Sequence, residues 1–296
     1  MPDNTTVKVG LVQTHYPDSR EAAFSEVSDL IQQCVDRGAE LVCLQELSFD
    51  PYFCQTEDHS HFALAEDLNG SIANFAAEQS KKHSIVLLAG LFERRAPGMF
   101  HNSFLIFEKD GTCVDLYRKT HIPEDPSFNE KFYFTPGENT FPSFKTSVGT
   151  IGVCICWDQW FPEAARLTAL SGAQIIFFPS AIGWQADDKK HFGQSQVEAW
   201  KTMMRSHAIA NGVFVCATNR TGLESSIEFW GNSFVCDPYG NFLEVASQDQ
   251  QAVLISELNL SICETARTHW PFLRDRRTDL YAEITRKLRT DQRDRH

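Results

Sequence analysis

Short, almost wholly apolar runs that alternate with helix-like stretches are the feature that most constrains the fold of this chain. Residues 39–45 and 84–92 are such runs, each long enough for one strand. A strand with no polar alternation is usually covered on both faces, as in a parallel sheet between helices. Residues 20–37 carry apolar side chains at helical spacing, and 193–211 form a second long helical stretch. The pattern predicts strands and helices in alternation.

Hairpin signals extend this pattern. The turn Lys109-Asp110-Gly111 separates strands expected at 102–108 and 112–118. Hairpins added to alternating strands and helices predict a mixed sheet with helical cover, an α/β or α+β layered domain. Neither a linker nor a repeat is recognisable. We therefore expect residues 1–296 to form a single domain, with a helical C-terminal extension at about 278–296.

Charge and cysteine usage restrict the partners and the compartment. The net charge is −12, which argues against nucleic acid or an anionic membrane as partner, because both attract basic patches. The polar start lacks the apolar stretch of a signal peptide, and no run of about 18 apolar residues predicts a membrane span. Nine scattered cysteines indicate reduced thiols rather than a disulfide framework. A cytoplasmic protein is expected.

Cys156 is the first candidate for chemistry. It lies in TIGVCICWDQWFPEAAR, where an apolar strand runs into a polar turn and then a helix. Free backbone N–H groups at such an elbow favour a thiolate and bind an oxyanion. The alternative is that Cys154 and Cys156 are both small core residues, as free cysteines usually are. A zinc site is not indicated, since Cys-x-Cys has no partner motif at metal-ligand spacing.

Glu46 and Lys119 are the second and third candidates. Glu46 ends an apolar strand, where α/β sheets place their ligands, and partial burial would raise its pKa toward that of a general base. Lys119 ends another strand before a proline-containing loop, where a fixed cation could stabilise an oxyanion. A solvated carboxylate and a surface lysine are the alternatives for these two residues taken singly.

Three segments in order resemble the signature blocks of the carbon–nitrogen hydrolase (nitrilase-like) family. They are LQELSFDPYF, YRKTHIPEDPSFNEKFYFTPG and VCICWDQWFPEAARL. The resemblance implies a Glu–Lys–Cys triad of Glu46, Lys119 and Cys156, with Glu130 as a second pocket glutamate and the Trp157 N–H as an oxyanion donor. It also implies a four-layer α-β-β-α sandwich, homo-oligomers, and no metal or other cofactor.

The branch of the family that is most similar hydrolyses N-carbamoylputrescine. The segments PYFCQ, EKFYFTPG, CWDQWFPE and FPSAIG carry this finer resemblance, which implies a small cationic ureido substrate. The segment GWQADDKKHFGQSQVEAW departs from the family pattern. Hydrolysis of another N-carbamoyl compound such as N-carbamoyl-β-alanine, or of a linear amide or nitrile, remains an alternative, as does a catalytically silent binding relative. The intact triad argues against the silent relative.

Four further residues are candidates for the wall of the pocket. Tyr52 and Trp184 could form apolar walls, although aromatic side chains in a phenylalanine-rich chain are usually core. His121 could line the pocket, although loop histidines are more often structural. Asp187 could pair with a substrate ammonium, although a solvated charge at the start of a helix is the simpler interpretation.

Overall fold

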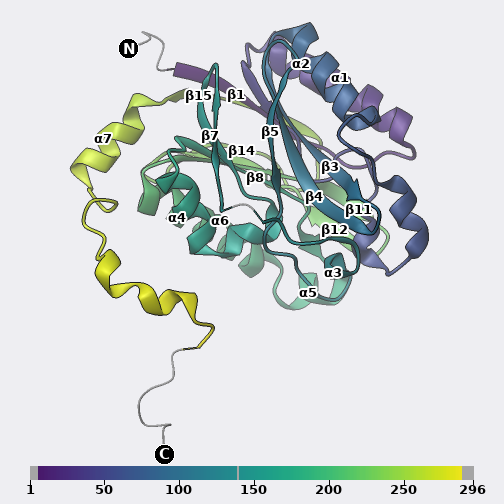
Figure 1. Ribbon diagram of the computed structural model, residues 1–296. Helices are drawn as coiled ribbons and strands as arrows, with labels where there is room; N and C mark the ends of the chain where they lie inside the picture. The colour runs from purple at the N-terminus through teal and green to yellow at the C-terminus, as the bar shows by residue number, and fades with distance from the viewer. Residues whose placement is uncertain (1–5, 139, 289–296) are drawn as a thin grey trace, which may run out of the picture.

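Two six-stranded sheets form the centre of the computed structural model, which describes residues 6–138 and 140–288 (Figure 1). The first sheet has the order β15-β1-β2-β3-β4-β5 and the second has the order β14-β13-β10-β8-β7-β6. The first comprises β1 (Thr6–Gln13), β2 (Leu41–Cys43), β3 (Val86–Ala96), β4 (Met99–Phe107), β5 (Cys113–Arg118) and β15 (Ala252–Asn259). The second comprises β6 (Ser143–Thr146), β7 (Gly149–Val153), β8 (Ile175–Ser180), β10 (Phe214–Asn219), β13 (Phe234–Cys236) and β14 (Phe242–Val245).

Helices cover the outer face of each sheet. Helices α1 (Arg20–Asp36) and α2 (Ser71–His83) pack on the first sheet, whereas α4 (Pro162–Leu170) and α6 (Gly193–Asn211) pack on the second (Figure 1). The remaining helices are short: α3 (Glu130–Tyr133), α5 (Ala186–His191) and α7 (Ser261–His269). The order of layers is helix, sheet, sheet, helix, which confirms the expected α-β-β-α sandwich.

Alternation along the strands explains why both faces of the first sheet are apolar. Leu11 and Leu88 join the cluster between the two sheets, and their neighbours Val12 and Leu87 join the cluster beneath α1 and α2. Successive side chains of a strand point to opposite faces, so each face receives every second residue. A run with no polar position therefore suits a strand covered on both sides, as the sequence pattern predicts.

Parallel strands bring distant parts of the chain to one edge. Strand β2 runs parallel to β1 and β3, and β8 runs parallel to β7 and β10. The carboxyl ends of parallel strands meet at the same edge of a sheet. Because the two sheets face each other, with β1 packed on β10, the loops that follow β2, β5, β7 and β8 converge.

Several boundaries and elements differ from the sequence-based expectation. Strand β7 ends at Val153, three residues before Cys156, and the chain then enters a 3-10 turn at Cys156–Trp160. Strand β15, which completes the first sheet by pairing with β1, was not predicted. Neither was a small sheet of β9 (Gly183–Trp184), β11 (Thr221–Glu224) and β12 (Ile227–Trp230). These elements depend on strand pairing over long sequence distances, which local patterns do not encode.

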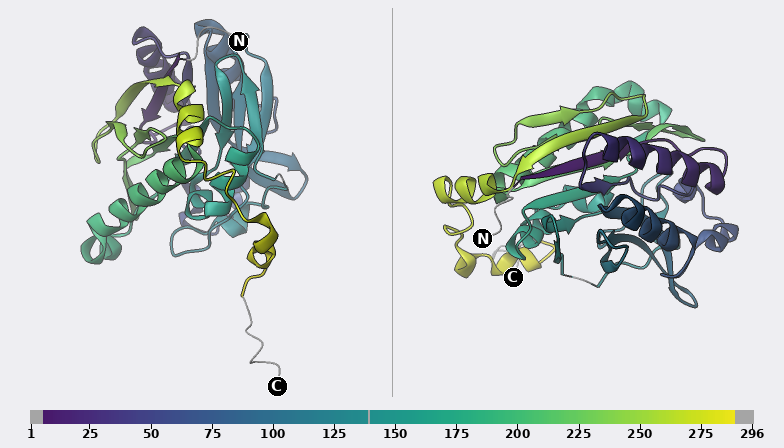
Figure 2. Two further views of the ribbon diagram at one scale, coloured as in Figure 1. Left: turned by 90° about the vertical axis from the view of Figure 1, so that its left-hand side faces the viewer. Right: turned by 90° about the horizontal axis from the view of Figure 1, so that it is seen from above.

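The C-terminal segment leaves the body of the molecule (Figures 1 and 2). In place of a continuous helix, it contains two short 3-10 helices, Thr278–Leu280 and Ala282–Thr285. The rest of the expected extension, residues 289–296, lies outside the described residues. Other short 3-10 helices span Phe53–Gln55 and His59–Leu64. Within the described residues, no helix has the length and apolar character needed to cross a bilayer.

Candidate active site

Glu46, Lys119 and Cys156 follow three different strands and meet between the two sheets. Glu46 comes after β2, Lys119 directly follows β5, and Cys156 comes after β7. The side chains of Glu46 and Lys119 are wholly buried, and Cys156 is 6% exposed. The structure thus brings together the three residues that the sequence analysis singled out separately.

Lys119 lies between two carboxylates. Its Nζ is 2.8 Å from Oε1 of Glu46 and 2.6 Å from Oε2 of Glu130. Burial alone would lower the pKa of Lys119, but the two carboxylates outweigh it and hold this pKa well above its usual range. The lysine is therefore a permanent ammonium group, and its side chain is wholly buried.

Glu46 receives two further hydrogen bonds that set its orientation. Asn102 Nδ2 donates to Oε1 at 2.6 Å, and the Ala181 N–H donates to Oε2 at 2.8 Å. The buried guanidinium of Arg220 donates to the carbonyl oxygens of Leu47 and Asp50 at 2.7 and 3.0 Å. Because Leu47 has a φ of +49°, these contacts stabilise an otherwise unfavourable turn directly after Glu46.

Glu130 differs from Glu46 in its environment. It opens α3, and its Oε1 accepts a hydrogen bond of 2.8 Å from the hydroxyl of Tyr52. Burial raises the pKa of Glu130 from 4.5 to about 7, and the Lys119 ammonium limits that rise. Glu130 is therefore a weaker acid than an exposed glutamate.

Cys156 occupies a strained elbow. It has a φ of +42°, in the left-handed region that residues other than glycine rarely adopt. Burial and the Glu46 carboxylate raise the pKa of its thiol well above the usual range, although Lys119 opposes them. The resting side chain is thus a neutral thiol, and it needs a neighbouring base to become a nucleophile.

Cys156 and Glu130 open onto a cavity of about 650 Å³. Apolar walls come from Phe128, Trp157, Trp160 and Trp230, and polar groups come from Asp125, Asp187, Asp188, Gln185 and Gln196. Among the described residues that line this cavity, none is lysine, arginine or histidine. Such a cavity has the size of a small-molecule site and favours a ligand with a positive charge.

Three of the expected pocket residues lie outside the lining of this cavity. Tyr52 is buried behind Glu130, and its hydroxyl supports that carboxylate. Trp184 is 3% exposed and packs on Trp230, with a centroid distance of 5.1 Å. His121 donates to Oδ1 of Asp158 through Nδ1 at 2.7 Å, and its ring stacks on Phe161.

Asp187 does line the cavity, as does Trp157, whose backbone N–H is the expected oxyanion donor. Asn102, Ala181, Asp158 and Trp230 are contacts that sequence reasoning missed. Asn102 lies within β4, and only the neighbouring strand places it against Glu46. The one usable signal was Asp158, an acidic residue two positions after Cys156.

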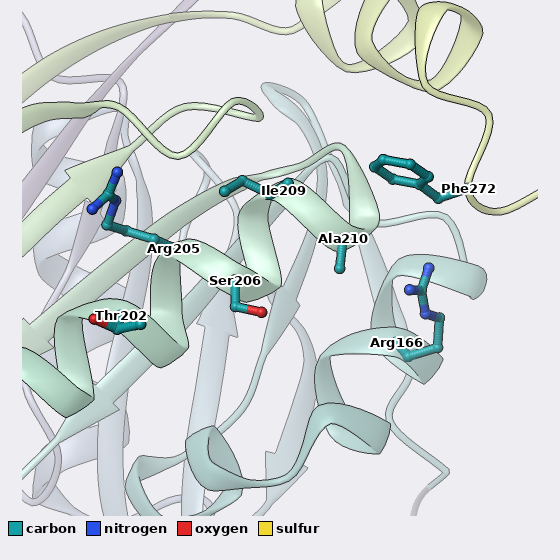
Figure 3. Close-up of a pocket in the computed structure, with 7 residues that line it drawn as sticks. All are labelled: Arg166, Thr202, Arg205, Ser206, Ile209, Ala210 and Phe272. Atoms are coloured by element: carbon teal, nitrogen blue, oxygen red, sulfur yellow. The ribbon is translucent and has the colours of Figure 1, made fainter.

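A second cavity, of about 490 Å³, contains none of these residues (Figure 3). It is lined by residues of α4 and α6 and by Phe272 from the C-terminal segment. Within the described part of the chain, no group of three or more His, Cys, Asp or Glu is arranged to hold a metal ion.

Comparison with known proteins agrees with the resemblance in the sequence. A family-wide sequence profile described as carbon-nitrogen hydrolase matches residues 8–268. An N-carbamoylputrescine amidase of Oryza sativa is 39% identical over 93% of each chain. A citrullinase of Francisella tularensis is 35% identical over 95% of this chain and 99% of that protein.

A solved structure supports the same assignment. The carbon-nitrogen hydrolase of Helicobacter pylori G27 has a TM-score of 0.93 and 43% identity, over 96% of this chain and all of that one. The fold and the sequence matches both extend over almost the whole chain, including the loops that hold Glu46, Lys119 and Cys156. The chain therefore belongs to the carbon–nitrogen hydrolase family and is a hydrolase of non-peptide carbon–nitrogen bonds.

Proposed function

We propose that this enzyme hydrolyses N-carbamoylputrescine to putrescine, carbon dioxide and ammonia, with Cys156 as its nucleophile. The main support is the arrangement of a thiol, a buried Glu–Lys–Glu cluster and an acidic cavity without basic residues in its described lining. Similarity to N-carbamoylputrescine amidases of rice and other plants supports the same substrate.

Acylation begins with the neutral thiol. Glu46 accepts the proton of Cys156 as the sulfur attacks the ureido carbon, so a C–S bond forms and the carbonyl oxygen becomes an oxyanion. Lys119 and the Trp157 N–H stabilise this oxyanion, and one such donor is typically worth about 3–4 kcal/mol. The C–N bond to the terminal nitrogen then breaks, and Glu46 returns the proton to the leaving ammonia.

Deacylation consumes one water. Glu46 takes a proton from the water as it attacks the carbamoyl thioester. When the C–S bond breaks, Glu46 passes this proton to the leaving sulfur, which restores the thiol and the carboxylate. The product is a carbamate, which decomposes to carbon dioxide and putrescine. Glu130 shares the Lys119 ammonium with Glu46, so it keeps this cation in place whichever protonation state Glu46 has reached.

The charge of the cavity favours a substrate with a distal ammonium. Asp125, Asp187 and Asp188 supply negative charge, and the Trp230 wall can add cation–π attraction of about 0.5–2 kcal/mol. A desolvated substrate carboxylate is usually met by arginine through paired hydrogen bonds. The described lining has no such group.

Citrulline is the second candidate, because a citrullinase is 35% identical to this chain. It presents the same ureido group on a short alkyl chain, and its distal end carries an ammonium group together with a carboxylate. The acidic cavity suits the ammonium and repels the carboxylate. We therefore expect citrulline to be the poorer of the two substrates.

We also propose that the enzyme is a cytoplasmic homo-oligomer. Its nine cysteines are free thiols, as in a reducing compartment, and cell fractionation tests that location. The C-terminal segment leaves the body of the molecule (Figure 2). Its side chains Trp270, Phe272, Leu280 and Ile284 are exposed to solvent. Large exposed apolar groups usually mark an interaction surface. Light scattering should give a multiple of the 33.6 kDa chain mass, and a monomer at micromolar concentration would contradict the proposal.

The nucleophile is tested by a pair of cysteine variants. Cys156→Ala should lower kcat by at least about 10⁴-fold, because covalent catalysis is lost, while circular dichroism shows an unchanged fold. Cys154→Ala is the matched control: this thiol is wholly buried, 3.4 Å from the Thr168 hydroxyl. It should keep most of the ammonia release. Substantial turnover by Cys156→Ala would remove that residue from the mechanism.

The substrate is tested by comparing ureido compounds. We expect kcat/KM to be highest for N-carbamoylputrescine, lower for citrulline and lowest for N-carbamoyl-β-alanine, whose distal end carries only a carboxylate. Asp187→Asn together with Asp188→Asn should lower kcat/KM for the cationic substrate through KM. Equal or better hydrolysis of a carboxylated compound by the wild type would exclude the proposed substrate and leave the family assignment intact.

Glu130 gives a stability prediction. Its pKa is raised by burial from 4.5 to about 7, so the folded state retains a proton that the unfolded chain has already released between these pH values. The contribution of Glu130 to the free energy of unfolding is therefore full below about pH 4.5 and lost as pH rises through 7. Glu130→Gln should remove this slope in denaturant titrations. Glu138→Gln, at a side chain 72% exposed, is the control. An unchanged slope in Glu130→Gln would refute the assignment.

A further inference from the structure

Asp158 is a buried carboxylate that the proposed mechanism does not use. It lies in the 3-10 turn Cys156–Trp160, two residues after the thiol. Its Oδ2 accepts from the Ile155 N–H at 3.0 Å and from the Tyr117 hydroxyl at 2.7 Å. Its Oδ1 contacts the N–H and the Nδ1 of His121 at 2.9 and 2.7 Å.

These partners surround two of the three triad residues. Tyr117 and His121 stand two positions before and two positions after Lys119, and Ile155 directly precedes Cys156. Tyr117 belongs to β5 of the first sheet, whereas the Cys156 turn follows β7 of the second. One carboxylate therefore connects the Lys119 segment of one sheet to the Cys156 segment of the other.

The turn itself depends on Asp158. The Asp158 N–H donates to the Ile155 carbonyl at 3.0 Å, and the Asp158 side chain accepts from the Ile155 N–H, so two bonds close the chain across Cys156. A residue with the backbone of Cys156, at a φ of +42°, is strained and persists only where its surroundings hold it.

A comparison with Glu93 separates this arrangement from an ordinary buried acid. Glu93 is 1% exposed and accepts two hydrogen bonds from Arg118, at 2.7 and 2.6 Å, and one of 2.6 Å from Ser103. Its partners all lie in β4 and β5 of the first sheet. Asp158 is equally well bonded, but its bonds cross between the sheets at the reacting groups.

We propose that Asp158 is a positioning residue that sets the separation between the Lys119 ammonium and the Cys156 thiol. The inference rests on the proposed function, in which these two groups act on the same ureido carbonyl. Misplacement by about 1 Å can cost a reaction roughly 10²-fold in rate. Asp158 itself is absent from the described lining of the cavity, so it acts through its neighbours and not on the substrate.

The test is Asp158→Asn with Glu93→Gln as the matched control. Asparagine keeps the shape but has one acceptor oxygen, so either His121 or the pair Tyr117 and Ile155 faces an amide NH2 and loses its acceptor. We expect kcat per intact active site to fall by roughly 10²-fold, with KM changed less than about threefold. The number of intact active sites is measured by alkylating Cys156 and quantifying the modified Cys156 peptide by mass spectrometry. Glu93→Gln should lower the midpoint of thermal unfolding but retain kcat per site.

The pH profile of alkylation provides a readout that a purely structural role would not change. Lys119 lowers the pKa of Cys156, so its displacement in Asp158→Asn should move the alkylation profile to higher pH. Tyr117→Phe removes a single donor and should give a smaller loss of kcat in the same direction. If Asp158→Asn does not fold, Tyr117→Phe alone tests the positioning role of Asp158.

The proposal would be overturned if Asp158→Asn retained the wild-type kcat per site and an unshifted pH profile of alkylation. If only Tyr117→Phe folds, the same result in that variant would overturn it. This failure is distinct from failure of the proposed function. If Cys156→Ala stays active, the nucleophile is wrong. If Cys156→Ala is inactive and Asp158→Asn behaves like Glu93→Gln, the nucleophile stands and only the positioning role is lost.

Discussion

The ammonium of Lys119, buried between Glu46 and Glu130, is the interaction on which the rest of the site depends. Transfer of an ion from water to a protein interior costs several kcal/mol, and removal of one partner from a buried pair typically costs about 3–5 kcal/mol more. Two carboxylates at 2.8 and 2.6 Å offset this penalty, but only while β5, α3 and the loop after β2 remain in place. The chemistry and the assembly of the sheets are therefore coupled.

The same cluster explains how a neutral thiol can react. Burial keeps the pKa of Cys156 high, so the free enzyme does not expose a reactive thiolate to oxidants. In the proposed mechanism, the proton moves to Glu46 only when the substrate supplies the developing oxyanion that Lys119 stabilises. Reactivity is thus confined to the occupied cavity, where the substrate excludes water and strengthens each charge interaction.

The sequence predicted more of the fold than of the pocket. The apolar runs located β2 and β3, and the helical spacing located α1 and α6 with boundaries close to those observed. The walls of the pocket were less accessible to prediction. Trp184 is buried behind Trp230, because β9 and β12 pair across a small sheet that local patterns do not indicate. His121 contacts Asp158 outside the cavity lining, and nothing in its sequence neighbourhood indicates that orientation.

The sequence by itself determined the chemical groups and the ends of the strands on which they stand. Glu46 and Cys156 each follow a short apolar run, Lys119 follows a predicted hairpin strand, and these positions depend only on local residue order. Tertiary structure decided the rest: that Lys119 contacts Glu130 as well as Glu46, that Asp158 joins the two sheets, and that four acidic residues share one cavity. The physical reason is that these contacts join residues brought together by the folding of loops onto the sheets and by the packing of one sheet on the other. The energy of a buried charge depends on its surroundings in space and not on its neighbours along the chain.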